Sequence, residues 1–160
     1  MIELADAFPD TTIVLNHCGH AMAIELNASA RERVFHDYRR LMIEADRRPN
    51  IHCKVGGLGM PFWGVGFEER RDAIGYGELA KAWRPYVETT IEAFGVNRCL
   101  MESDYPPDGR CAGFVPLWNA LKYIFRSASA DEKAALFHGT AARVYRIRVP
   151  VAQPGKAPST

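Results

Sequence analysis

The chain lacks the features by which several large classes of protein are identified. No stretch approaches the roughly 20 apolar residues of a membrane-spanning helix, and the N-terminus has neither the basic nor the apolar segment of a secretory signal. The net charge is only +1 at pH 7, whereas proteins that bind nucleic acid concentrate Lys and Arg on one face. We therefore expect neither a membrane nor a nucleic acid as a partner.

Cysteine is scarce and irregularly spaced. The four cysteines form no C-x-x-C pair and no evenly spaced framework (Cys18, Cys53, Cys99 and Cys111). Cys53 and Cys99 lie in apolar, strand-like runs, where an unpaired cysteine behaves as a small hydrophobic residue. The pattern excludes a disulfide scaffold and predicts a cytoplasmic protein.

What remains has the composition of an ordinary globular domain. The 160 residues are 48% hydrophobic and 24% charged, which is enough for one domain with a sizeable core and names no activity. Residues 148–160 are rich in proline and have no large apolar residue after Val151. We predict that they form a disordered tail.

Helical and strand-like patterns alternate along the chain. The β-branched or apolar runs at 12–15, 51–55 and 98–102 predict three strands. Apolar residues at helical spacing predict helices before, between and after them, over 2–8, 34–45, 78–94, 116–126, 130–138 and 140–145. The order is that of an α/β protein.

Individual residues predict where some of these helices begin and end. Pro85 predicts a kink or a fresh helix start, because proline lacks an N–H and clashes with the preceding turn. Ser129 and Glu132 have the spacing of a capping box. Gly95 and Gly139 are expected to end their helices, and Thr140 to cap the last one.

Strands that are separated by helices must run parallel, because each helix supplies the crossover. The strand runs do not alternate with polar residues, which predicts burial on both faces. Three such strands leave two open edges and have too few helices to cover both faces. The pattern therefore predicts an arc of a larger structure, and a chain that opens inside a helix suggests further elements upstream.

Polar side chains follow each predicted strand at its carboxyl end, where α/β proteins collect their functional groups. Asp104 could bind a divalent metal and take a proton from the metal's water, or could cap a turn. His17 could act as a catalyst or as a hydrogen-bonded structural residue. His20 could join His17 in binding a metal only if their loop turned helical. Lys54 could neutralise a substrate carboxylate or pair with a neighbouring acid.

A long loop over residues 56–77 is rich in glycine and aromatic residues, and loops of this length are usually functional or disordered. Trp63 could belong to a substrate lid or could pack the loop onto the rest of the domain. His52 lies within a strand, and His36 and His138 lie on helices. We interpret these three as packing or surface residues.

Four blocks, in order, resemble one known family: FPDTTIVLNHCG (8–19), NIHCKVGGLGMP (50–61), WRPYVETTIEAFGVNRCLMESDYP (83–106) and DEKAALFHGTAARVYR (131–146). They resemble the amidohydrolase-2, or amidohydrolase-related, family, and within it the sugar-lactonase-like TIM-barrel metal-dependent hydrolases. The resemblance covers residues 1–147.

The resemblance implies a (β/α)8 TIM barrel whose sixth, seventh and eighth strands end at His17, Lys54 and Asp104. Residues 1–147 would then form only the C-terminal portion of the domain. Family members commonly carry an H-x-H pair on the first strand and a histidine on the fifth. These have no counterpart in the chain.

The resemblance also implies site roles. Asp104 would ligate a divalent metal, for which zinc is the first expectation, and would accept a proton from water. His17 would polarise the carbonyl of a lactone-like small-molecule substrate. Charge and position suggest Lys54, Arg70 or Arg71 for holding a substrate carboxylate or hydroxyl, with Trp63 beside them.

Three functional hypotheses stay open. The first is a fragment of a metal-dependent hydrolase that is inactive without its N-terminal half, with non-oxidative decarboxylation as the rival reaction. The second is a non-catalytic half-barrel that covers its open strands as a homo-oligomer or with a partner. The third is a free-standing three-stranded binding module.

Overall fold

The computed structural model describes residues 1–23 and 27–148, and within them three strands form one parallel sheet in the order β1-β2-β3. The strands are β1 (Ile13–Leu15), β2 (Ile51–Val55) and β3 (Cys99–Met101). In the sheet, Cys53 lies opposite both Leu15 and Cys99. The predicted α/β class with parallel strands is confirmed.

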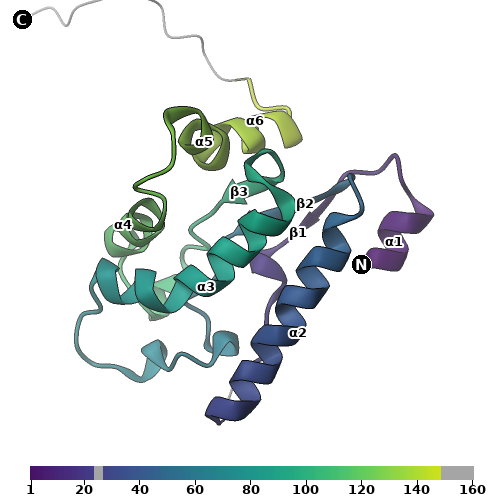
Figure 1. The fold of residues 1–160 in the computed structure, drawn as a ribbon. Coiled ribbons are helices and arrows are strands. Elements are labelled where there is room, and N and C mark those ends of the chain that lie inside the picture. Colours follow the sequence, from purple (N-terminus) through teal and green to yellow (C-terminus); the bar gives the residue numbers. More distant parts are fainter. Residues whose placement is uncertain (24–26, 149–160) are drawn as a thin grey trace, which may run out of the picture.

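The helices come before, between and after the strands along the chain (Figure 1). Their bounds are α1 (Ile2–Ala7), α2 (Ala28–Asp46), α3 (Tyr76–Phe94), α4 (Phe114–Ile124), α5 (Ala130–Ala134) and α6 (Thr140–Val144). The long helix α3 crosses in front of the strands in Figure 1 and packs against both α2 and α4. One core thus joins the sheet to its helices.

Helix α2 presents one apolar stripe to this core. Tyr38, Met42 and Ala45 are buried, at the spacing that places residues on one face of a helix. The helix begins two turns before the predicted start at 34, where the Asn27 side chain accepts a hydrogen bond from the Ala30 N–H at 2.9 Å. The apolar pattern does not extend into those turns, so it could not reveal them.

Pro85 does not begin a new helix, contrary to one of the two predicted outcomes. It lies inside α3, which continues from Tyr76 to Phe94. Buried residues such as Leu79, Trp83 and Val87 flank it on the core side, while Pro85 itself is exposed. Packing on both sides of the proline outweighs the single lost hydrogen bond.

The prediction that Gly139 ends a helix is wrong. A π-helical segment, Ala135–Gly139, joins α5 to α6, and Gly139 has the ordinary helical φ of −65°. Thr140 does not cap the next helix, because its hydroxyl donates to the Val96 carbonyl at 3.0 Å. The Ser129–Glu132 capping box and the end of α3 at Gly95, where φ is +70°, are confirmed.

Burial of the strands on both faces was also predicted, and it is wrong for two of them. In β2 the side chains of Ile51, Cys53 and Val55 are buried, while His52 and Lys54 between them are only half-buried. All three residues of β1 are half-buried. The helices of the chain therefore leave part of the sheet open.

None of the described helices is long and apolar enough to cross a membrane. The four cysteines are all free and buried. The predicted tail, apart from Arg148, lies outside the described residues.

Candidate active site

The carboxyl ends of the three strands bring His17, Lys54 and Asp104 to the same edge of the sheet. His17 follows β1, Lys54 lies near the end of β2, and Asp104 follows β3. The His17 Nε2 atom lies 3.6 Å from Asp104 Oδ1. These two residues thus face one another although β2 separates their strands.

Glu102 links the members of this group. Its Oε1 atom lies 2.6 Å from His17 Nδ1 and accepts the backbone N–H of His17 at 3.2 Å. Its Oε2 atom lies 3.5 Å from Lys54 Nζ. A carboxylate so little exposed needs such partners, and the Lys54 ammonium compensates its charge.

Asp104 is held in an unusual backbone conformation with one oxygen unsatisfied. Its φ is +47°, and φ is also positive at His17, Cys18 and His20. Non-glycine residues in this left-handed region collect at functional sites, where the surrounding structure holds the strain. The Oδ2 atom of Asp104 is buried and has no hydrogen-bond partner among the described residues.

Two glycines after β2 leave the space in which this group fits. A Cβ atom on Gly57, where φ is +66°, would lie 2.6 Å from the Cβ of His17 and 2.7 Å from its ring. A Cβ atom on Gly56 would lie 2.3 Å from the backbone oxygen of Glu102. The chain that follows β2 can thus pass between His17 and Glu102 only because both of its first two residues are glycine.

Asp108 forms a second carboxyl beside Asp104. Its Oδ2 atom accepts the Gly59 N–H at 3.1 Å, and its Oδ1 atom is buried without a partner among the described residues. Burial raises the pKa of Asp108 to about 7, the Gly59 N–H opposes this rise, and the nearby Asp104 adds to it.

The loop after β1 makes a tight turn in which φ is positive at His17, Cys18 and Gly19, so it is not a regular helix of the kind that was the condition for His17 and His20 to bind a metal together. His17–Gly19 form one 3-10 turn, and the two rings lie 5.0 Å apart. Burial, followed by the neighbouring His17, lowers the pKa of His20. The His20 ring packs edge-on against Phe62 at 5.6 Å.

The structure does not bring Trp63 and Arg70 into this group. Trp63 is 2% exposed, and its indole N–H donates to the Gly57 carbonyl at 2.7 Å. Its ring lies against Tyr38 and Tyr86. Arg70 pairs with Asp72 and Glu78 on the surface. Their predicted roles in substrate binding stay predictions, and the geometry favours packing for Trp63.

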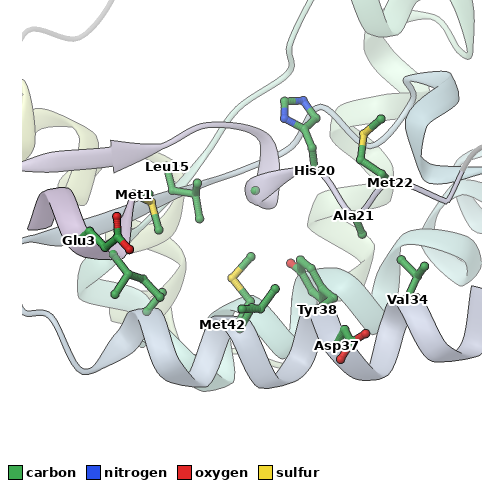
Figure 2. Close-up of a pocket in the computed structure, with 14 residues that line it drawn as sticks. Met1, Glu3, Leu15, His20, Ala21, Met22, Val34, Asp37, Tyr38 and Met42 are labelled. Atoms are coloured by element: carbon green, nitrogen blue, oxygen red, sulfur yellow. The ribbon is translucent and has the colours of Figure 1, made fainter.

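A groove of about 730 Å³ lies elsewhere, between α1, the end of β1 and α2 (Figure 2). Its lining is mainly apolar and includes Leu15, Val34, Leu41 and Met42. Figure 2 shows the His20 ring pointing away from α2. His20 lines the groove and lies beside His17, whereas His17, Glu102 and Asp104 themselves do not line it.

Comparison with known proteins decides the family. The amidohydrolase family model matches residues 1–147. The chain belongs to the amidohydrolase family. Among curated proteins, it is 36% identical over 146 residues to the Sinorhizobium fredii protein y4mH, covering 91% of this chain and 42% of that protein. It is 28% identical over 155 residues to the L-fucono-1,5-lactonase of Burkholderia ambifaria, covering 94% and 47%. The chain thus spans less than half the length of these two relatives.

Solved amidohydrolases share the fold. A Burkholderia multivorans amidohydrolase crystallised with bound Zn is 23% identical, with a TM-score of 0.72 over 92% of this chain and 49% of that one. An amidohydrolase 2 from Bifidobacterium longum subsp. infantis is 18% identical, with a TM-score of 0.53 over 92% and 46%. At these identities the likeness extends to the fold alone.

The residues of this amidohydrolase chain fit a catalytic metal only in part. The buried, unpartnered Oδ2 atom of Asp104 is the kind of oxygen that a divalent cation binds. Yet within residues 1–23 and 27–148 no three His, Cys, Asp or Glu side chains are placed to hold one. The described residues by themselves therefore do not supply a metal site.

Sequence reasoning missed Glu102 and Asp108. Glu102 directly follows β3, and its position among polar strand-end residues was a signal, but nothing local showed that it would meet His17, 85 residues earlier. Asp108 lies in the short 3-10 turn Pro107–Arg110, where an aspartate followed by glycine indicates only a turn.

Proposed function

We propose that this chain forms the sixth to eighth strands of an amidohydrolase (β/α)8 barrel and carries part of the active site of a hydrolase for lactone-like substrates. One observation carries the proposal. His17 and Asp104 come from strands that are not neighbours, yet their side chains approach to 3.6 Å at the carboxyl ends of the sheet.

The open parts of the sheet support the barrel. Among the described residues, β1 pairs with β2 alone, and β1 is only half-buried. His52 and Lys54 project from a face that the helices leave half-covered. A closed barrel has no free edges and fills this face with side chains from the other strands. Elements beyond these 160 residues would supply them.

The relatives support the reaction class. Two proteins that the chain matches are named L-fucono-1,5-lactonases, from Burkholderia ambifaria and Burkholderia multivorans. Because the chain spans 47% and 44% of them, we assign the activity to the completed barrel. The substrate class is a small cyclic ester.

The chemistry follows from the two side chains. Asp104 accepts a proton from the attacking water, and its unpartnered Oδ2 atom leaves an acceptor for that proton. The oxygen adds to the ester carbonyl carbon, and negative charge develops on the carbonyl oxygen. The His17 ring, when both of its nitrogens carry a proton, donates a hydrogen bond from Nε2 to that oxygen and stabilises its charge. The bond between the carbonyl carbon and the ring oxygen then breaks, and the departing ring oxygen takes the proton from Asp104, which yields a hydroxy acid and restores the carboxylate.

The test measures hydrolysis of γ- and δ-sugar lactones, followed with a pH indicator, by the native gene product that carries these residues. We expect Asp104→Asn and His17→Ala each to lower kcat/KM by roughly a hundredfold or more. His36→Ala, on the exposed face of α2, should leave it unchanged. Near-normal turnover in both site variants would reject the assignment. Release of carbon dioxide from a carboxylated substrate would show that the reaction is decarboxylation and not hydrolysis.

A second candidate function, a non-catalytic assembly, is favoured by the apolar groove of about 730 Å³. The groove and the open edge of β1 together form a surface on which a second copy could bury apolar side chains. Size-exclusion chromatography tests this candidate. A well-folded monomer with cooperative unfolding contradicts it.

A further inference from the structure

We propose that Glu102 is a positioning residue, which holds the His17 ring with its proton on Nδ1 and so presents Nε2 toward Asp104. The role of this orientation in catalysis rests on the proposed function, whereas the orientation itself does not. Glu102 would thereby set which nitrogen of the neutral histidine carries the proton.

The contacts of Glu102 oxygen Oε1 support this role. It lies 2.6 Å from His17 Nδ1 and 3.2 Å from the backbone nitrogen of the same residue. The backbone N–H can only donate, so Oε1 acts as an acceptor there. An ionised carboxylate accepts from Nδ1 as well, which requires the proton on Nδ1. Second partners of this kind set the tautomer and orientation of functional histidines.

Glu102 is itself fixed on two sides. Its backbone N–H donates to the Val55 carbonyl at 3.1 Å, which continues the pairing of β2 with β3. Its other carboxylate oxygen, Oε2, lies 3.5 Å from Lys54 Nζ. The side chain is only 15% exposed. The carboxylate therefore has little freedom to leave His17.

The His17 ring cannot shift toward Gly57, because the two residues are already in close contact. The α-carbon of Gly57 is so close that a Cβ atom there would lie 2.7 Å from His17 Nδ1. With Nδ1 held by Glu102, the opposite nitrogen, Nε2, is the one that lies 3.6 Å from Asp104 Oδ1. Glu102 thus contacts the Nδ1 atom of the His17 ring, and Asp104 faces its Nε2 atom.

The test is long-range 1H–15N NMR of the imidazole nitrogens in the 15N-labelled chain in mildly alkaline buffer, with His17→Gln used to assign the His17 signals. We expect the His17 Nδ1 nitrogen to have the chemical shift of a protonated nitrogen. In Glu102→Ala the neutral ring should shift toward its usual form, with the proton on Nε2. In Glu102→Gln the Nδ1 proton should remain, because the amide oxygen can still accept both bonds.

Glu92→Ala, an exposed carboxylate on α3, is the matched control and should leave the His17 signals unchanged. Unprotonated Nδ1 in the unsubstituted chain would overturn the proposal without any variant. So would an Nδ1 proton that persists in a folded Glu102→Ala chain. Neither readout depends on hydrolysis, so failure of the lactonase assay and failure of this inference are distinguishable.

Discussion

The imidazole of His17 and the carboxylate of Asp104 approach to 3.6 Å, across the end of a strand that belongs to neither. Strand β2 lies between β1 and β3 in the sheet, and its first two following residues are Gly56 and Gly57. A side chain at either position would occupy the space of Glu102 or His17. The geometry of the site therefore depends on residues that carry no functional group.

Gly57→Ala should destabilise the fold and displace His17. The new methyl group would lie 2.6 Å from the His17 Cβ, and φ at this position is +66°. Strain in the left-handed region costs about 1–3 kcal/mol for a non-glycine residue, and the overlap adds to it. We expect the free energy of unfolding in urea to fall by about 2 kcal/mol or more.

Gly77→Ala is the matched control for this loss. Gly77 lies in the first turn of α3, and a Cβ atom there meets nothing within 4 Å. Alanine in a helix is favoured over glycine by roughly 0.5–1 kcal/mol. Gly77→Ala should therefore raise the free energy of unfolding, and a loss at both positions would refute the steric explanation for Gly57.

Trp63→Phe separates packing from substrate binding at this residue. The indole N–H donates to the Gly57 carbonyl at 2.7 Å, and both residues are buried. A buried carbonyl left without its donor costs about 1–3 kcal/mol, so urea unfolding should report a loss of this size. Phe62→Leu, at a side chain 37% exposed, should cost less than about 1 kcal/mol. Unchanged stability with a raised KM in Trp63→Phe would instead support a substrate lid.

The apolar pattern of the sequence predicted those parts of the fold that depend on residues close together in the chain. The three strands and their parallel direction followed from helices alternating with β-branched runs. The continuation of α3 through Pro85 and of the last helices through Gly139 did not, because packing at both sites overrides the propensity of one residue. Glycine and proline mark where a helix can end, and tertiary contacts decide whether it does.

The supporting residues of the site could not be predicted for a different reason. Glu102 meets a residue 85 positions away, and Asp108 meets Gly59, 49 positions away. No local pattern encodes such a pairing. What the sequence does contain is the paired glycine after β2, and its close approach to His17 becomes visible only when the three strands are placed side by side.

His52 should make stability depend on pH. Its ring is half-buried on β2, its Nδ1 atom has no partner among the described residues, and burial lowers its pKa from the ordinary 6.5. The unfolded chain then binds a proton at a higher pH than the folded one. Stability is retained above about pH 6.5 and falls as the pH drops through the folded pKa.

Urea unfolding across this pH range checks the prediction. His52→Gln should reduce the loss of stability on acidification, while His20, whose pKa is also lowered, leaves part of it. His36→Gln, at an exposed position on α2, should leave the dependence as it is. An unchanged slope in His52→Gln would show that its burial is not what makes acid destabilising.

Two substitutions on α2 test whether the apolar groove drives association. Leu41 is 48% exposed and lines the groove, whereas Ile43 is 51% exposed and lies with His36 and Arg39 on another surface. Lysine at either position adds the same charge and replaces an apolar side chain of similar exposure. If the groove and the edge of β1 bind a second copy, Leu41→Lys should weaken self-association at least tenfold in sedimentation equilibrium, because a charge must then be buried or displaced. Ile43→Lys should associate like the unsubstituted chain. Equal weakening by both variants would show that net charge, and not the groove, controls association. A monomeric unsubstituted chain would show that the groove does not bind a second copy.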